Sequence, residues 1–269
     1  METSIDRTKW YDRILASFIY FTRLPFWRMH EPPKECFAAV MEHWPLTGWL
    51  TGGLMAATLY VGSMYLPYMV AVLLAIVVRL LVTGARQEDG LADFLDGFGG
   101  GGNDRRRILA IMRDPRTGTY GVVGLVVYIL LLAGVLYSMV PKLAAIAILA
   151  ADPFSKMVTS QLVMMMPYAY REEERPLGTS TAFRKMDMKA GISLAIQGLL
   201  PIAAFIWLTD VAWEILFFIP CIIMYFLYLM IWRRLRGYTF GCCGAVSLII
   251  ELMIYVIVCA TVTTIYDKI

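Results

Sequence analysis

Seven apolar segments constrain the fold of this chain most strongly, because each is about as long as a helix that crosses a bilayer, roughly 20 residues. Hydrophobic residues make up 59% of the 269 residues and charged residues only 17%, which leaves too little polar surface for a soluble globule. We therefore expect an all-α integral membrane protein, with residues 1–269 forming one polytopic domain of about seven transmembrane helices. The expected spans are residues 45–65, 68–86, 119–140, 142–168, 189–208, 212–232 and 243–266.

The segments outside these spans set the orientation of the protein. Residues 14–26 are apolar and aromatic but too short to span, so they predict an N-terminal helix at the membrane interface. Of the 24 Lys and Arg residues, 20 lie in four polar segments that seven spans place on one side. The positive-inside rule makes this side cytoplasmic. The four segments are residues 1–34, 86–118, 171–189 and 233–236.

An acidic segment opens residues 86–121, between two of the expected spans. Asp89, Asp93 and Asp96 are spaced i, i+4 and i+7, so on a helix they share one face. Carboxylates this close repel one another unless a cation lies between them, and oxygen ligands without Cys or His suit Mg²⁺. The alternative is a solvated polar face on a cytoplasmic loop. We favour a metal site, because ionisable groups that begin where a span ends are usually functional.

A glycine run at residues 98–103 follows the acids, and basic residues 105–107 and Arg113 follow the glycines. Glycines let backbone amides approach phosphate groups, and the N-terminus of a following helix adds its dipole. Flexible linkers have the same composition, so the run alone is weak evidence. Flanked by carboxylates and arginines, it indicates a site for a nucleotide phosphate. Residues 105–107 fit contact with anionic lipid equally well.

Four ionisable residues lie inside the expected spans, where a charge needs a partner. Asp152 and Lys156 are spaced i, i+4, and they form either an ion pair that neutralises itself or a contact to substrate. Glu251 needs a basic partner, for which both Arg79 and Lys156 are candidates. Arg79 is also placed to snorkel or to meet the acidic segment.

The acidic segment closely resembles that of one family, the adenosylcobinamide-GDP ribazoletransferases or cobalamin synthases. The resemblance rests on Asp-Gly-Leu-Ala-Asp at 89–93 with Asp-Gly at 96–97, Ile-Met-Arg-Asp at 111–114, and Gly-Thr-Tyr-Gly at 118–121. It extends over most of the chain, to Phe-Thr-Arg-Leu-Pro at 21–25, Trp-Pro-Leu-Thr-Gly at 44–48 and the turn at 237–245. The central motif is long and specific.

The resemblance implies a Mg²⁺-dependent enzyme of the bacterial inner membrane whose active site faces the cytoplasm. Its substrates would be adenosylcobinamide-GDP and α-ribazole or α-ribazole 5′-phosphate, and GMP would leave. Membrane lipid and other cobalamin-pathway enzymes are further expected partners, whereas nucleic acid is not. The expected catalytic residues are Asp89, Asp93, Asp96 and Asp114, of which Asp89, Asp93 and Asp96 bind the metal. The expected substrate-binding residues are Gly90, Gly97, Gly99, Gly100, Arg113, Gly118, Arg23, Tyr238 and Thr239.

Two departures from the family pattern stand out. Gln87 occupies the position where the family usually has His, which removes a possible base or phosphate donor. In the turn at 237–245, Phe240 and Gly241 replace the family's Gly-Asp, so a carboxylate is missing and a ring occupies a glycine position. A loss of activity from either change would leave a family member that binds corrinoid but turns over weakly.

Two other classes of protein remain as alternatives. A CDP-alcohol phosphotransferase also places Asp residues on helices at the cytoplasmic face, but its DxxDGxxAR core is absent here, since Leu91-Ala92 is followed by Asp93. A transporter fits the number of spans equally well. The gathering of acids on one face of the membrane argues against it.

Overall fold

The computed structural model describes residues 9–170, 183, 186–209 and 211–266, with side chains up to residue 261. Within these residues the chain forms ten α-helices and two 3-10 helices and no strand, which confirms the expected all-α class. The helices are α1 (Trp10–Phe21), η2 (Phe26–Arg28), η3 (Lys34–His43), α2 (Trp44–Tyr65), α3 (Tyr68–Thr83), α4 (Arg86–Gly100), α5 (Arg105–Ile111), α6 (Thr119–Tyr137), α7 (Pro141–Met165), α8 (Met188–Thr209), α9 (Trp213–Leu235) and α10 (Phe240–Tyr266).

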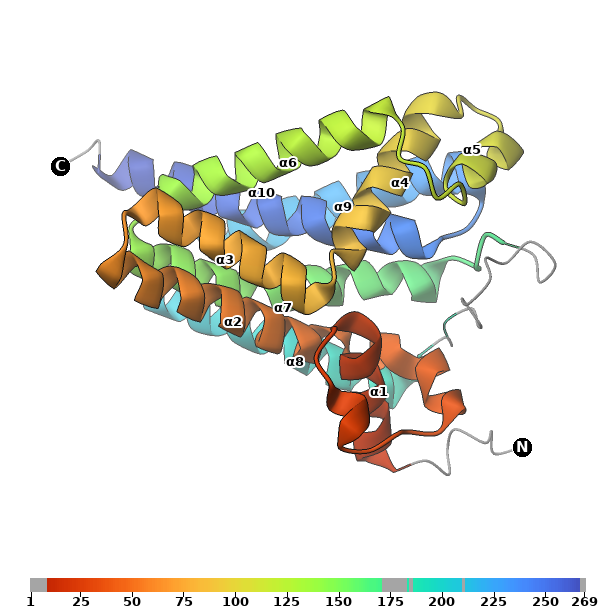
Figure 1. Ribbon diagram of the computed structural model, residues 1–269, viewed down its shortest axis with the longest axis horizontal. Coiled ribbons are helices and arrows are strands. Elements are labelled where there is room, and N and C mark those ends of the chain that lie inside the picture. The colour runs from red at the N-terminus through yellow and green to blue at the C-terminus, as the bar shows by residue number, and fades with distance from the viewer. Residues whose placement is uncertain (1–8, 171–182, 184–185, 210, 267–269) are drawn as a thin grey trace.

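The long helices run side by side in an elongated bundle with α7 and α10 in its interior (Figure 1). Helix α2 packs extensively on α7 because two of its glycines remove side chains from the contact. A Cβ added to Gly48 would lie 2.9 Å from the backbone of Pro153, and one on Gly52 would lie 3.1 Å from Asp152 Cβ. Small residues at a helix contact let the backbones approach in this way.

Among the described residues, five helices are long and apolar enough to cross a membrane, namely α6, α7, α8, α9 and α10. Helices α3 and α4 supply a sixth candidate if the bent pair is counted as one broken span. Helix α2 has 22 residues, but its glycines and threonines lower its hydropathy, and it is not among these candidates. The described helices therefore support a membrane-embedded protein, and the expected number of seven spans is not confirmed.

The basic segments that the structure describes gather at one end of the bundle. Helices α1, α4 and α5 and the turn between α9 and α10 lie together at this end, and the C-terminus lies at the other (Figure 1). This agrees with the expectation that residues 86–118 and 233–236 share a side with the N-terminal segment. Most of the third basic segment, residues 171–182 and 184–185, lies outside the described residues.

A bend of 89° separates α3 from α4, so the preceding span does not continue into the acidic segment. The bend is made by Gly84 and Ala85, which both adopt left-handed backbone conformations, with φ of 66° and 56°. Glycine is required at the first position for a second reason: an added Cβ would lie 2.3 Å from Arg23 Nε. As a result, α4 crosses the end of the bundle instead of running along it (Figure 1).

Candidate functional site

Helix α4 carries the three aspartates that the sequence predicts on one helical face. Asp89 is exposed, Asp93 is half-buried and Asp96 is buried. Burial, followed by the neighbouring charges of Asp89 and Asp96, raises the pKa of Asp93 from 3.8 to about 7. The three carboxylates therefore act on one another as predicted, although the helix that carries them starts anew at Arg86.

Asp96 has a structural role that the sequence did not reveal. Its Oδ2 accepts a hydrogen bond from the Gly118 backbone N–H at 2.7 Å, and its Oδ1 accepts one from the Gly121 N–H at 2.9 Å. These two N–H groups belong to the first turn of α6, where no carbonyl within the helix is available to them. Asp96 thus links the N-terminus of α6 to α4 through these two hydrogen bonds. A Cβ on Gly118 would lie 2.6 Å from the same carboxylate, which explains the glycine.

The donor set is compatible with Mg²⁺ only if a substrate completes it. Among the described residues, no group of three or more His, Cys, Asp or Glu side chains is arranged to hold a metal ion. Protein Mg²⁺ sites usually combine one or two carboxylates with water and substrate phosphates. Asp89 and Asp93 fit such a site, since their repulsion is a charge that a cation would relieve. Metal binding by all three aspartates stays a prediction.

A pocket of about 500 Å³ opens beside the buried end of α4. Asp96, Asp114 and Arg116 contribute its charged groups, and Tyr120 contributes an aromatic ring. The Arg116 guanidinium donates to both carboxylate oxygens of Asp114, at 3.0 and 2.8 Å, and holds the pKa of that carboxyl at about 2. Asp114 therefore lies next to the acidic helix as predicted, but it is already paired with a cation of the chain.

Arg113 and Asp93 both lie close enough to Tyr170 for their charges to act on it. The pKa of the Tyr170 phenol is raised chiefly by burial. The Tyr170 hydroxyl donates to the Leu109 carbonyl at 3.3 Å. Arg113 is exposed, so its guanidinium can reach a ligand in solution.

Two of the four glycines of the run, Gly99 and Gly100, belong to helix α4 itself, and Gly101 is its C-cap. Gly97, Gly99 and Gly100 lie in its last turn, where backbone N–H groups bond to carbonyls four residues earlier. Their lack of side chains serves packing: a Cβ on Gly97 would lie 2.6 Å from Met112 Cγ, and one on Gly99 would lie 2.7 Å from the Tyr120 ring. Phosphate binding by these glycines stays a prediction, and it would have to use the helix surface.

Gly90 lies in the close contact between α4 and α10. An added Cβ would lie 3.1 Å from both the Cα and the carbonyl oxygen of Gly241. Across the same contact, a Cβ on Gly244 would lie 3.0 Å from the Gln87 carbonyl oxygen. The turn at 237–245 therefore packs directly under the acidic helix, close to Asp93.

Three further predicted substrate-binding residues have local structural roles. The Thr239 hydroxyl accepts from the Cys242 N–H at 3.1 Å and caps the first turn of α10. Tyr238 is buried, and its backbone pairs with Pro167 and Ala169 at 2.9 and 2.8 Å. Arg23 packs on the bend before α4. These positions are consistent with support of the site, and direct contact with substrate stays a prediction.

Phe240 is not strained in its place at the start of α10. Its ring packs 5.8 Å from Tyr20, 6.5 Å from Phe21 and 6.4 Å from Phe183 between centroids. The backbone at Phe240 is not left-handed, because among the described residues only Ala85 and Arg236 combine positive φ with a side chain.

Arginines that no motif identified hold the end of the bundle together. Arg105 donates to the Leu235 carbonyl at 2.8 Å and to the Ala169 carbonyl at 2.5 Å. Arg234 donates to the Phe98 carbonyl at 2.9 Å. Arg105 was expected to meet phosphate or lipid, and it instead closes the C-terminal end of α9. A run of arginines in the sequence carries no signal that distinguishes these uses.

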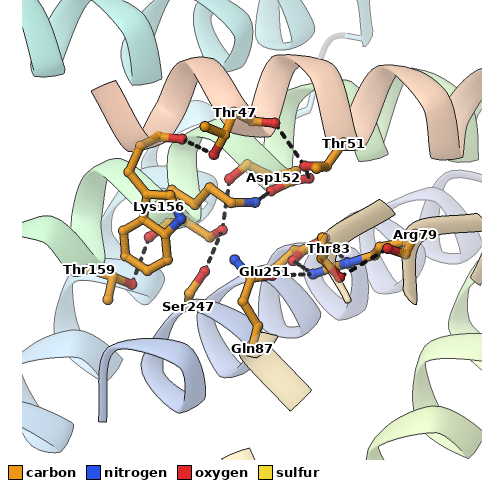
Figure 2. Close-up of polar contacts among 12 residues, drawn as sticks. Thr47, Thr51, Arg79, Thr83, Gln87, Asp152, Lys156, Thr159, Ser247 and Glu251 are labelled. Atoms are coloured by element: carbon orange, nitrogen blue, oxygen red, sulfur yellow. Dashed lines mark hydrogen bonds and ion pairs between the residues drawn. The ribbon is translucent and has the colours of Figure 1, made fainter. Parts of the chain in front are cut away.

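Two buried ion pairs occupy the interior of the bundle (Figure 2). Arg79 donates two hydrogen bonds to Glu251, both 2.6 Å, so Arg79 is the partner of Glu251 and does not snorkel. Asp152 pairs with Lys156 on α7, and Asp152 Oδ2 accepts from the Thr51 hydroxyl at 2.6 Å. Both residues of this second pair are 1% exposed, which supports the self-neutralising alternative over contact with substrate.

Comparison with known proteins identifies the chain's relatives. The cobalamin-5-phosphate synthase family model matches residues 13–259. The chain is 32% identical to the adenosylcobinamide-GDP ribazoletransferase of Shewanella frigidimarina, covering 94% of this chain and 97% of the relative. The corresponding proteins of Shewanella baltica and Leptospira interrogans are 30% and 28% identical, covering 93% and 91% of this chain and 95% and 94% of theirs. No solved structure matches. The chain belongs to the cobalamin-5-phosphate synthase family.

Proposed function

We propose that this protein joins adenosylcobinamide-GDP to α-ribazole or its 5′-phosphate and releases GMP. A ribose hydroxyl oxygen forms a bond to the phosphorus next to the cobinamide side of the donor. The bond between that phosphorus and the GMP oxygen breaks, and the hydroxyl proton passes to a carboxylate. The observation that carries the proposal is the pair Asp89 and Asp93 on α4, which share a face and repel each other.

Phosphoryl transfer of this kind depends on positioning and electrostatics. Asp89 and Asp93 would hold Mg²⁺, which supplies polarisation of the phosphate oxygens when bound. Arg113 is exposed, and like Asp93 it lies near Tyr170, so it would meet negative charge on the departing GMP. Among the acids, Asp114 is the least suited to receive the proton, because Arg116 lowers its pKa to about 2.

The proposed location is the bacterial inner membrane, with α4 on the cytoplasmic side. The gathering of basic segments at the end of the bundle that carries α4 supports this orientation (Figure 1). Cysteines introduced for Asn103 and for Ser138, at opposite ends of the bundle, test it. A membrane-impermeant thiol reagent added to intact cells should label the Ser138 variant and spare the Asn103 variant. Labelling of only the Asn103 variant would invert the orientation.

The activity is tested with purified protein in detergent. We expect the protein to release GMP from adenosylcobinamide-GDP. The release should require Mg²⁺ and an acceptor, either α-ribazole 5′-phosphate or α-ribazole, and it should stop when EDTA is added. Tight corrinoid binding without GMP release would indicate the weakened family member. Release of CMP from a CDP-alcohol instead would contradict the proposal and favour the phosphotransferase alternative.

A further inference from the structure

The right-angle junction between α3 and α4 raises the question of what fixes the direction of α4. Ala85 occupies a left-handed conformation with φ of 56°, which is unfavourable for an L-residue because its Cβ approaches the following carbonyl oxygen. A junction with such an unfavourable conformation persists only where surrounding contacts determine it. The contacts that span the junction therefore decide where the carboxylates of α4 point.

One buried side chain spans this junction. Arg79 lies on α3 before the bend, and its Nη2 donates to the Gln87 side-chain oxygen on α4 at 3.3 Å. Its Nε lies 3.9 Å from the Glu88 carboxylate, also on α4. Gln87 and Glu88 are 4% and 5% exposed and immediately precede Asp89. Arg79 thus contacts the first turn of the acidic helix from the buried side.

The same guanidinium is held from a third helix. Glu251 of α10 accepts from Arg79 through both carboxylate oxygens, at 2.6 Å each (Figure 2). The Tyr255 hydroxyl donates to Glu251 at 2.6 Å. A bidentate Arg–carboxylate contact fixes the plane of the guanidinium and therefore its remaining donors. Backbone contact between Gly90 and Gly241 presses α4 onto α10 one turn further along.

We propose that the buried Arg79–Glu251 pair is a positioning device for the acidic helix. It joins α3, α4 and α10 at one guanidinium, and it sets the direction in which α4 presents Asp89 and Asp93 to substrate. The effect of this pair on GMP release rests on the proposed function. Its effect on the local stability of α4 can be measured whatever reaction the protein catalyses.

The chain contains a matched control for this proposal. Asp152 and Lys156 form an ion pair of the same depth, but both residues belong to α7, and the Asp152 carboxylate accepts a hydrogen bond from Thr51 of α2. The Lys156 charge also acts on Glu251, so this control measures what α4 loses beyond that shared electrostatic effect. Neutralising either pair removes one buried positive and one buried negative charge. Of the two pairs, only Arg79–Glu251 contacts α4 through a described hydrogen bond or ion pair, so its removal should change the site more than removal of the Asp152–Lys156 pair.

The experiment compares the double variants Arg79→Gln with Glu251→Gln and Asp152→Asn with Lys156→Gln. Backbone hydrogen exchange is measured for peptides of α4 and of α7, together with GMP release at varied Mg²⁺. The first variant should speed exchange in α4 more than in α7. It should also lower kcat about tenfold or more and raise the Mg²⁺ concentration needed for half-maximal rate. The second should speed exchange mainly in α7, with GMP release per folded molecule within about twofold of the parent.

A milder variant covers the case in which the first double variant does not fold. Gln87→Met removes only the hydrogen bond to α4 and leaves the ion pair intact, so it should change α4 exchange and the Mg²⁺ requirement in the same direction by a smaller factor. Equal effects of the two double variants on α4, or parent-like exchange in α4 after Arg79 and Glu251 are neutralised, would overturn the proposal. A parent that releases no GMP would overturn the proposed function, and the exchange comparison would still test the positioning.

Discussion

Helix α4 and the middle of α7 both place carboxylates among apolar residues, but they compensate the charge differently. On α7, Asp152 pairs with Lys156 and accepts a hydrogen bond from Thr51. On α4, Asp93 lies half-buried beside Asp89, and among the described ion pairs neither has a basic partner. Burial alone therefore does not mark a site in this protein. What marks a site is a carboxylate that has no basic partner within the chain, because a bound cation or ligand then has to balance its charge.

The largest effect on activity is expected from a substitution of Asp93. We expect Asp93→Asn to lower GMP release by about 10³-fold or more, equivalent to about 4 kcal/mol of barrier, because it would remove one of the oxygens proposed to hold Mg²⁺. The thermal unfolding midpoint in detergent should not fall, since Asn also removes repulsion with Asp89. Asp104→Asn is the control, because Asp104 caps α5 and Asn caps as well as Asp. Near-parent rates in Asp93→Asn would sink the assignment.

The opposite behaviour is expected of Asp152→Asn. The substitution leaves Lys156 buried without its carboxylate, and breaking a buried pair in this way costs about 3–5 kcal/mol of stability. GMP release per folded molecule should stay within about twofold of the parent. Thermal unfolding and activity measured on the same preparation separate the two effects. A stable but inactive Asp152→Asn would show that the α7 pair belongs to the site after all.

Restoring the family's Gly-Asp at positions 240 and 241 should increase the difference between α4 and α7, because it adds another unpaired carboxylate next to α4. A Cβ at position 241 would lie 3.5 Å from Asp93 Cβ and 3.1 Å from the flexible Met112 Cε, so Asp fits there beside Asp93. We expect Phe240→Gly with Gly241→Asp to raise GMP release about tenfold, or about 1.4 kcal/mol. Phe240→Gly alone loses ring packing and should give no gain. A parent already as fast as the double variant would exclude a catalytic role for this turn.

The smallest expected effect concerns pH. The folded pKa of Asp93, about 7, exceeds its ordinary value of 3.8, so between these values the folded protein binds a proton that the unfolded chain does not. Stability from this group is therefore present at low pH and is lost as the pH rises towards 7. Without divalent cations, the parent's unfolding midpoint should fall more over this range than that of Asp93→Asn. An equal fall of the unfolding midpoint with pH in the parent and in Asp93→Asn would show that the pKa of Asp93 is not raised in the folded protein.

The helices and the acidic face could be predicted because they depend on local patterns. Apolar length identified the long helices, and i, i+4, i+7 spacing placed Asp89, Asp93 and Asp96 on one face. The bend could not be predicted, since Gly84 is a common residue in such helices and Ala85 gives no sign of a left-handed conformation. A span count also stayed open, because α2 is long without being strongly apolar.

Pairings between distant residues were beyond the sequence. Nothing in it distinguished Arg79 from Lys156 as the partner of Glu251, because the choice depends on how α3, α7 and α10 pack. The anchoring of α6 by Asp96 was missed for the same reason, since Gly118 and Gly121 lie more than twenty residues away. The helical state and close packing of Gly99 and Gly100 were also missed, because composition alone does not separate a phosphate loop from a helix that needs close packing.

The right-angle junction at Gly84 and Ala85 has a consequence for how substrates travel. Because α4 lies across the end of the bundle and Asp89 is exposed there, a water-soluble reactant would reach the acids directly from the aqueous phase in the proposed orientation (Figure 1). The long apolar helices at the same time hold the protein in a membrane. Encounters with any other enzyme held in that membrane would then be searches in two dimensions, which shortens the path that a reactant made there has to travel.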